Sequence, residues 1–489
     1  MVVYFGFALG FFNTYLFTRQ GGFTQEQYGL TSTFIAFASI MFSIASFGAQ
    51  GFISKFYPYY KAHLPTEKND QLSWALLLPC IGFAFVALIA VASKDVLVDS
   101  IFSNSPELPE YFYWILPFGF GYTMFVILEA YAWMTRRSVL SNLLKEVLFR
   151  FFTTCLVLLT TYGIIGSFDG FIRLYAFIYP VLALVLLLVF LKNRDFVFQF
   201  SISRVTKRFY SKIMALASFV WTGGLVFNLA GVFDTIVIAA VLPNGMAAVA
   251  PFTLAQYISS LIQAPQRAII SASVSPLSHA WKDKDYRKIN MIYNRSSINQ
   301  LVFATGMFCL IWLNFEDGIV SFNLQEGYRA AMWPFLFLGL TRIIDMGTGV
   351  NAQIIGTSTF WRFDFISGMV LLACTLPLNY FLAREMGIVG PAISNLISFT
   401  LYNLIRYLFL YRRFNMQPFT IKTVYTLLLA AASYLLTYSI FNEFRGIEWI
   451  LLRSVVFCSL FISGTVALRL SPDVQPVFTS LLKRLGLQR

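Results

Sequence analysis

Residues 73–93 read SWALLLPCIGFAFVALIAVAS and contain no charged side chain. A helix rises about 1.5 Å per residue, so roughly 20 apolar residues cross a hydrocarbon core about 30 Å thick. This stretch is therefore long enough and apolar enough to span a membrane. Apolar and polar residues do not alternate in it, so the pattern favours a helix over a barrel strand.

The rest of the chain repeats this pattern. Of its 489 residues, 58% are hydrophobic and 12% are charged, whereas soluble proteins carry about 25% charged residues. We predict an all-α polytopic membrane protein with about 14 transmembrane helices, short loops and no extramembrane catalytic domain. The first run has no basic segment before it, so we expect no cleavable signal. The predicted spans are residues 2–17, 29–52, 73–93, 111–133, 146–166, 170–191, 213–241, 249–272, 298–315, 331–353, 364–383, 390–410, 423–441 and 450–468.

Lysine and arginine gather in alternate loops. One set of loops holds 25 of the 36 basic residues, and the opposite set holds five. Because basic loops stay in the cytoplasm, we expect both termini there. We assign the net charge of +13 to this orientation and predict no nucleic-acid partner. The basic loops are residues 53–72, 134–145, 192–212, 273–297, 354–362, 411–422 and 469–489.

A short motif hints at an internal duplication. Residues 10–14, GFFNT, are echoed by residues 231–235, GVFDT, in the first and seventh spans. A parallel repeat of this kind predicts two six-helix lobes, residues 1–195 and 205–415. Residues 420–489 would then form two extra spans and a cytoplasmic tail.

Charged residues inside the spans are the candidates for function, because each costs from about 2.5 to more than 10 kcal/mol at mid-bilayer. Arg267 follows Pro265, which frees backbone carbonyls beside a polar cavity; the alternative is an arginine that snorkels to the interface. Arg342 stands three residues before Asp345, so the two either face a cavity or neutralise each other within one helix.

Arg150 and Arg173 are weaker candidates for substrate binding, because an acid on the same predicted helix can neutralise each of them. Each follows an acid by four residues, Glu146 and Asp169 respectively, and such spacing favours an intrahelical ion pair.

Two acids have no cation nearby in the sequence. Asp234 and Glu129 lie inside spans, and a lone buried carboxylate has a raised pKa that suits a proton or sodium carrier. The alternative is pairing with a distant arginine such as Arg267 or Arg342. We keep Asp345 as a third candidate for ion coupling.

Several chemistries lack the residues they need. The two histidines, His63 and His279, lie in predicted loops, and the five cysteines show no CxxC spacing. No phosphate-binding GxxxxGK[ST] motif is present. We therefore predict no enzyme, metal site or cofactor, and leave open coupling to a proton or sodium gradient.

Several stretches resemble the multidrug/oligosaccharidyl-lipid/polysaccharide exporter superfamily, and specifically its polysaccharide (O-antigen-type) flippases. The resemblance covers most of the chain as scattered small, aromatic and proline positions, with Asp234 in the seventh span. The other stretches that carry it are residues 6–14, 25–30, 47–48, 55–58, 264–265, 275–278 and 282–286.

This resemblance implies that two lobes enclose a central cavity and rock between inward- and outward-open states in a bacterial inner membrane. The substrate would be a polyprenyl-diphosphate-linked oligosaccharide, held by Arg267, Arg342, Arg150 and Arg173. Further partners would be membrane lipids and a polysaccharide polymerase or glycosyltransferase. A cation-coupled drug exporter of the same fold is the alternative, although Asn13 stands in the first span, where such exporters often have an acid.

Overall fold

The computed structural model describes residues 2–473, apart from the side chains of residues 2–4 and 361, and this part of the chain forms helices and no strands. The predicted all-α fold is confirmed. The helices are α1 (Val2–Thr18), α2 (Gln25–Ala45), α3 (Ala49–His63), η1 (Thr66–Lys68), α4 (Gln71–Ala92), η2 (Val96–Ile101), α5 (Leu108–Met134), α6 (Ser138–Asn142), η3 (Leu143–Leu148), α7 (Phe149–Thr161), α8 (Phe168–Ala176), α9 (Ile178–Lys192), α10 (Arg204–Val241), α11 (Gly245–Ile262), α12 (Gln266–Lys282), α13 (Tyr286–Ser321), η4 (Glu326–Ala331), α14 (Met332–Gly347), α15 (Asn351–Thr357), α16 (Trp361–Met386), α17 (Val389–Phe414), α18 (Ile421–Phe441) and α19 (Ile447–Ala467).

Every predicted span overlaps at least one helix, but the second, 29–52, is broken between α2 and α3, and not every helix is long. Within the described residues, 11 helices are long and apolar enough to cross a membrane. The other three predicted spans fall on α1, α7 and α14, which have 17, 13 and 16 residues. The total of 14 transmembrane helices therefore stays a prediction.

Local geometry explains two of the short helices. The fifth predicted span begins as the π-helix η3, and only then continues as α7. The tenth ends where the chain turns through Gly349, whose φ of +64° suits glycine. The eighth, predicted as one span over 249–272, is interrupted, because α11 ends at Ile262 and α12 begins only after Pro265.

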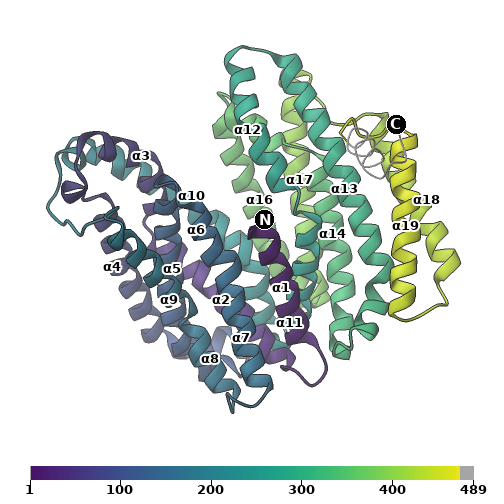
Figure 1. Cartoon of the computed structure of the whole chain (residues 1–489), viewed down its shortest axis with the longest axis horizontal. Coiled ribbons are helices and arrows are strands. Elements are labelled where there is room, and N and C mark those ends of the chain that lie inside the picture. Colours follow the sequence, from purple (N-terminus) through teal and green to yellow (C-terminus); the bar gives the residue numbers. More distant parts are fainter. Residues whose placement is uncertain (1, 474–489) are drawn as a thin grey trace. The chain divides into compact units, whose positions relative to one another are not determined.

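The chain forms two compact units, Met1–Ala250 and Pro251–Arg489 (Figure 1). In the first unit, α5 packs between α2 and α9, and α10 lies along α2 and α3. The indole Nε1 of Trp221 on α10 donates to the carbonyl of Ser43 on α2 at 2.9 Å. Aromatic rings fill the interior of this unit; Phe118, for example, stacks on Tyr175 at 5.1 Å.

The boundary between these units lies later than the boundary between the predicted lobes. Residues 204–241, which we expected to begin the second lobe, contact α2 and α3 of the first unit. The lobes at 1–195 and 205–415, with the extra segment 420–489, stay a prediction drawn from the repeat.

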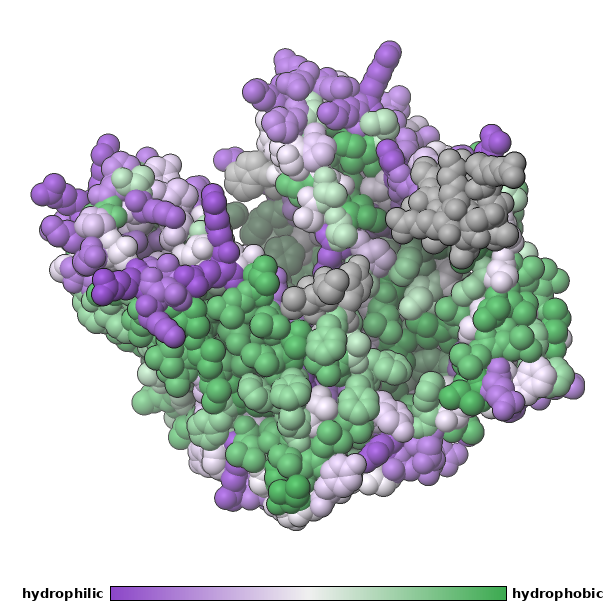
Figure 2. Space-filling model, in the orientation of Figure 1, coloured by the Kyte–Doolittle hydropathy of each residue, from purple (hydrophilic) through white to green (hydrophobic). Residues whose placement is uncertain are grey.

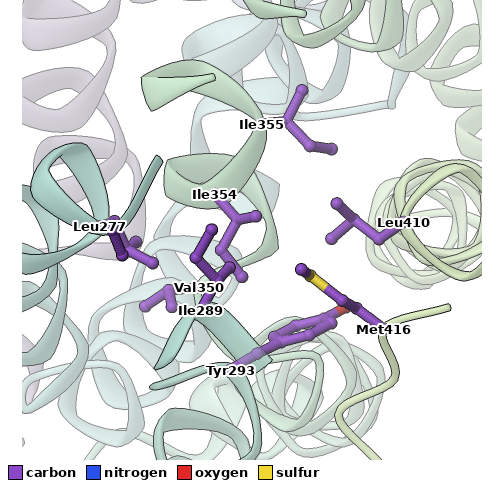
Figure 3. Close-up of a cluster of buried hydrophobic side chains, with 9 residues drawn as sticks. Leu277, Ile289, Tyr293, Val350, Ile354, Ile355, Leu410 and Met416 are labelled. Atoms are coloured by element: carbon purple, nitrogen blue, oxygen red, sulfur yellow. The ribbon is translucent and has the colours of Figure 1, made fainter. Parts of the chain in front are cut away.

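Among the described residues of the second unit, side chains gather in two hydrophobic clusters. The first joins α12, α13, α15 and α17, and the buried ring of Tyr293 lies at one edge of it (Figure 3). The second packs Phe457 and Phe461 of α19 against α13. The two C-terminal helices α18 and α19 are thus attached to the second unit by apolar packing on α13.

Candidate functional site

Arg267 lies at a break between two helices. Residues 263–265 form a turn, and Arg267 is the second residue of α12. Its side chain is exposed, and among residues 2–473 no carboxylate forms an ion pair with it. The break thus presents an uncompensated cation in a segment that we expected to be one continuous span.

The residue before it belongs to a buried polar cluster. Gln266 donates from Nε2 to Oδ2 of Asp345 at 3.0 Å, and Asn403 donates from Nδ2 to Oδ1 of the same carboxylate at 3.1 Å. Asn351 and Thr348 each donate to Oδ1 of Asn403 at 2.9 Å. We call these five side chains the Asp345 cluster.

The Asp345 cluster comes from helices distant in sequence. α12, α14, α15 and α17 each supply a member, and all except the half-buried Asp345 are buried. Asp345 accepts hydrogen bonds from the side-chain amides of two other helices, and its predicted part in ion coupling stays a prediction. Asp345 on α14 thus contacts Gln266 on α12, the residue directly before Arg267.

Arg342 lies one turn before Asp345 on α14 and is half-buried. The predicted substrate-binding role of Arg342 stays a prediction. Asp345 receives its hydrogen bonds from Gln266 and Asn403, two residues that our sequence interpretation did not single out.

Arg150 and Arg173 both form the ion pairs that their spacing predicts. Arg150 contacts Glu146 at 3.1 Å, and Arg173 contacts Asp169 at 2.6 Å. The Arg173 side chain is 58% exposed and lies over the ring of Trp114. Each arginine is thus paired with the acid four residues before it, and the substrate-binding role of both stays a prediction.

Glu129 is not a lone carboxylate. It is buried on α5, and Nζ of Lys145 approaches its Oε2 to 3.0 Å. Lys145 belongs to the π-helix η3, where the predicted loop 134–145 meets the fifth span. We expected any partner to be a distant arginine, whereas the partner is this lysine, and the charge on Glu129 is therefore compensated.

Asp234 is buried in the C-terminal half of α10. Its counterpart in the repeat motif, Asn13, is buried on α1. The side chain of Asn13 donates to the carbonyl of Arg150 at 2.8 Å and accepts from Thr154 at 2.5 Å. Asn13, in the first copy of the motif, thus joins α1 to α7. The ion-coupling role of Asp234 stays a prediction.

Two more embedded arginines are held by acids. Arg406 on α17 pairs with Asp364, donates from Nε to Ser367 at 3.0 Å and lies 3.8 Å from the ring centre of Tyr402. Arg453 on α19 pairs with the buried Asp317 of α13 at 2.5 Å. The sequence does not predict these pairs, because each joins two helices and the partners are not close in sequence.

No family model matches the chain, and no curated protein matches it. Solved structures do match. The lipid II flippase MurJ, in an inward closed conformation, aligns with a TM-score of 0.73 at 15% identity, over 96% of this chain and 97% of that one. An inward-facing multidrug resistance MATE family transporter of the MOP superfamily aligns with a TM-score of 0.65 at 16% identity, over 84% and 95%.

A MATE transporter in complex with MaL6 aligns less well, with a TM-score of 0.56 at 15% identity over 84% of this chain and 94% of that one. Identities this low show the fold alone. The chain therefore has the fold of these exporters, as the resemblance predicted. Membership of the polysaccharide flippase branch stays a prediction.

Proposed function

We propose that this chain is a transporter that moves a polyprenyl-diphosphate-linked oligosaccharide across a bacterial inner membrane by alternating access. The observation that carries the proposal is the extent of the match to the flippase structure. That match takes in 96% of the chain, against 84% for the drug transporters. A flippase-like chain also suits partners that make or polymerise the glycan, and we include them in the proposal.

Arg267 is the arginine that we assign to the diphosphate. A guanidinium forms bidentate hydrogen bonds with phosphate oxygens, and these are strongest where few water molecules compete. Four of the other embedded arginines already pair with carboxylates, namely Arg150, Arg173, Arg406 and Arg453. Arg267 is exposed and has no acidic partner among the described residues.

The Asp345 cluster offers a route to ion coupling. Gln266 and Arg267 are adjacent in the first turn of α12. If Asp345 takes up a proton or a sodium ion, its bond from Gln266 at 3.0 Å weakens, because the carboxylate loses charge. The start of α12 is then freer to move, and Arg267 moves with it.

Flipping by purified protein in liposomes tests the proposal. A fluorescent polyprenyl-diphosphate sugar is placed in both leaflets, and its protection from a membrane-impermeant quencher is followed over time. We expect Arg267→Ala to slow flipping at least about tenfold, because a charge-assisted bidentate contact contributes about 1.5–3 kcal/mol.

The matched control is Arg384→Ala, which removes an exposed arginine from the last turn of α16. It should flip the lipid at the rate of the unchanged protein. Arg267→Lys should recover part of the rate, because it keeps the charge and loses the planar fork. Equal rates in Arg267→Ala and Arg384→Ala would end the assignment of Arg267, and no flipping by the unchanged protein would contradict the proposed substrate.

A cation-coupled exporter of small molecules is the second candidate. The alignment with MATE transporters and the buried acid Asp234 favour it. It predicts drug efflux that needs a proton or sodium gradient and is lost in Asp234→Asn. Such efflux, in a protein that flips no lipid, would replace the first candidate.

A further inference from the structure

One end of the first unit carries many cations and very few anions. Its exposed basic side chains come from two helices that lie side by side, α3 and the beginning of α10. Figure 2 shows hydrophilic residues gathered at this end, beyond a broad hydrophobic surface. We call this set the cationic end; its members are Lys55, Lys61, Arg204, Lys207, Arg208 and Lys212.

Acids do not neutralise the cationic end. Neither α3 nor residues 204–212 contains an aspartate or a glutamate. Glu67 on η1 is the exposed acid nearest in sequence, and the nearby Asp70 is buried. Asp195 precedes α10 by nine residues in the sequence, and its carboxylate is already paired with Arg137 at 2.6 Å. The net charge of this surface is therefore strongly positive.

Aromatic packing and hydrogen bonds hold the cationic end in place. The ring of Phe209 on α10 lies 5.2 Å from Tyr59 on α3, and Arg208 and Lys212 lie over the same ring at 5.8 and 5.9 Å. The hydroxyls of Tyr60 and Thr206 are 2.6 Å apart. The cations thus stand on a fixed scaffold and not on a free loop.

The segment leading into α10 exposes apolar side chains next to these cations. Phe198, Phe200 and Ile202 are 49%, 50% and 52% exposed. Backbone hydrogen bonds hold the residues beside them in place. The N–H of Gln199 donates to Ser73 at 2.8 Å, and the N–H of Ser203 donates to Asp70 at 2.9 Å. We call residues 196–202 the aromatic loop.

We propose that the aromatic loop and the cationic end together bind the headgroups of anionic phospholipids. Exposed aromatic and branched side chains beside lysine and arginine are the combination that settles at a membrane interface, with rings at headgroup depth and cations on phosphate. The loop joins α9 to α10, both of which belong to candidate spans, so the bilayer surface lies within its reach. An acidic protein would match the charge but would leave the exposed rings without a purpose.

The test compares lipid binding by full-length protein in detergent. Phosphatidylglycerol and phosphatidylcholine are titrated separately, and bound lipids are counted by native mass spectrometry. A variant with Arg204→Gln, Lys207→Gln, Arg208→Gln and Lys212→Gln should bind phosphatidylglycerol at least about tenfold more weakly, because each cation near a lipid surface contributes roughly fivefold. Its binding of phosphatidylcholine should not change.

The control removes the same number of charges elsewhere. Lys282→Gln, Lys284→Gln, Arg287→Gln and Lys288→Gln neutralise four cations around α12 and α13 that alternate with Asp283 and Asp285. This control should keep its affinity for phosphatidylglycerol. A separate variant with Phe198→Ser and Phe200→Ser should bind both lipids more weakly by a similar factor, because it removes apolar contact without changing charge.

Equal phosphatidylglycerol affinities in the two charge variants would overturn the proposal. So would retained binding of both lipids in the aromatic-loop variant, since the rings would then have no part. Because neither readout involves transport, the result does not depend on which substrate the protein carries.

Discussion

At the scale of single residues, the embedded arginines differ in whether an acid pairs with them. A charge inside a membrane protein either meets a partner or lines a wet surface. Arg406 and Arg453 each meet a carboxylate from another helix, and both are buried. Such pairs join neighbouring helices, whereas Arg267, to which we assign the diphosphate in our proposal, is exposed.

Among the ion pairs of the embedded arginines, we expect the loss of the Asp317–Arg453 pair to lower stability most. The two side chains are 3% and 4% exposed, and Asp317 also accepts from Arg445 at 3.0 Å. Asp317→Asn leaves a buried guanidinium without a counter-charge, so we expect a loss of about 3–5 kcal/mol in stability. Thermal unfolding of the purified protein measures it as a lower midpoint.

Asp169→Asn is the matched comparison, because it breaks the exposed pair with Arg173, whose side chain is 58% exposed. Exposed pairs contribute about 0–1 kcal/mol, so its midpoint should barely move. If both variants unfold at the same temperature, the buried pair has no special part in attaching α19 to α13.

At the scale of helices, close approach depends on particular glycines. A Cβ at Gly29 on α2 would lie 1.8 Å from the carbonyl oxygen of Met246 on α11, within the first unit. The obstacle is backbone, which cannot rotate away. We expect Gly29→Ala to destabilise the protein by about 1–3 kcal/mol through overpacking, again measured as a lower unfolding midpoint.

Gly224→Ala supplies the control for that substitution. Gly224 also lies inside a helix, α10, and a Cβ there would meet no described atom within 4 Å. Alanine favours the helix over glycine by about 1 kcal/mol, so this variant should unfold at the same or a higher temperature. A fall of equal size in both variants would point to lost backbone freedom instead of the contact with Met246.

At the scale of the whole molecule, hydropathy predicted where the helices lie, because lipid selects long apolar segments regardless of what they touch. The spacing of charged residues predicted the ion pairs of Arg150 and Arg173, whose partners lie four residues away. It could not give the contacts of Asp345 with Gln266 and Asn403, because helix packing brings them together from 79 and 58 residues away. Short helices such as α7 depend on packing as well, so their boundaries were harder to predict.

The orientation of the whole chain in the membrane follows from charge and can be tested directly. The basic loops predict that residue 201 faces the cytoplasm and residue 442 faces outward; both Ser201 and Asn442 are exposed. In a background where the five cysteines are replaced by serine, a membrane-impermeant maleimide added to intact cells should label Asn442→Cys. It should label Ser201→Cys only after the membrane is opened. Labelling of both sites from one side would mean that the spans between them do not alternate as the charges predict, and the cytoplasmic location of both termini would then be wrong.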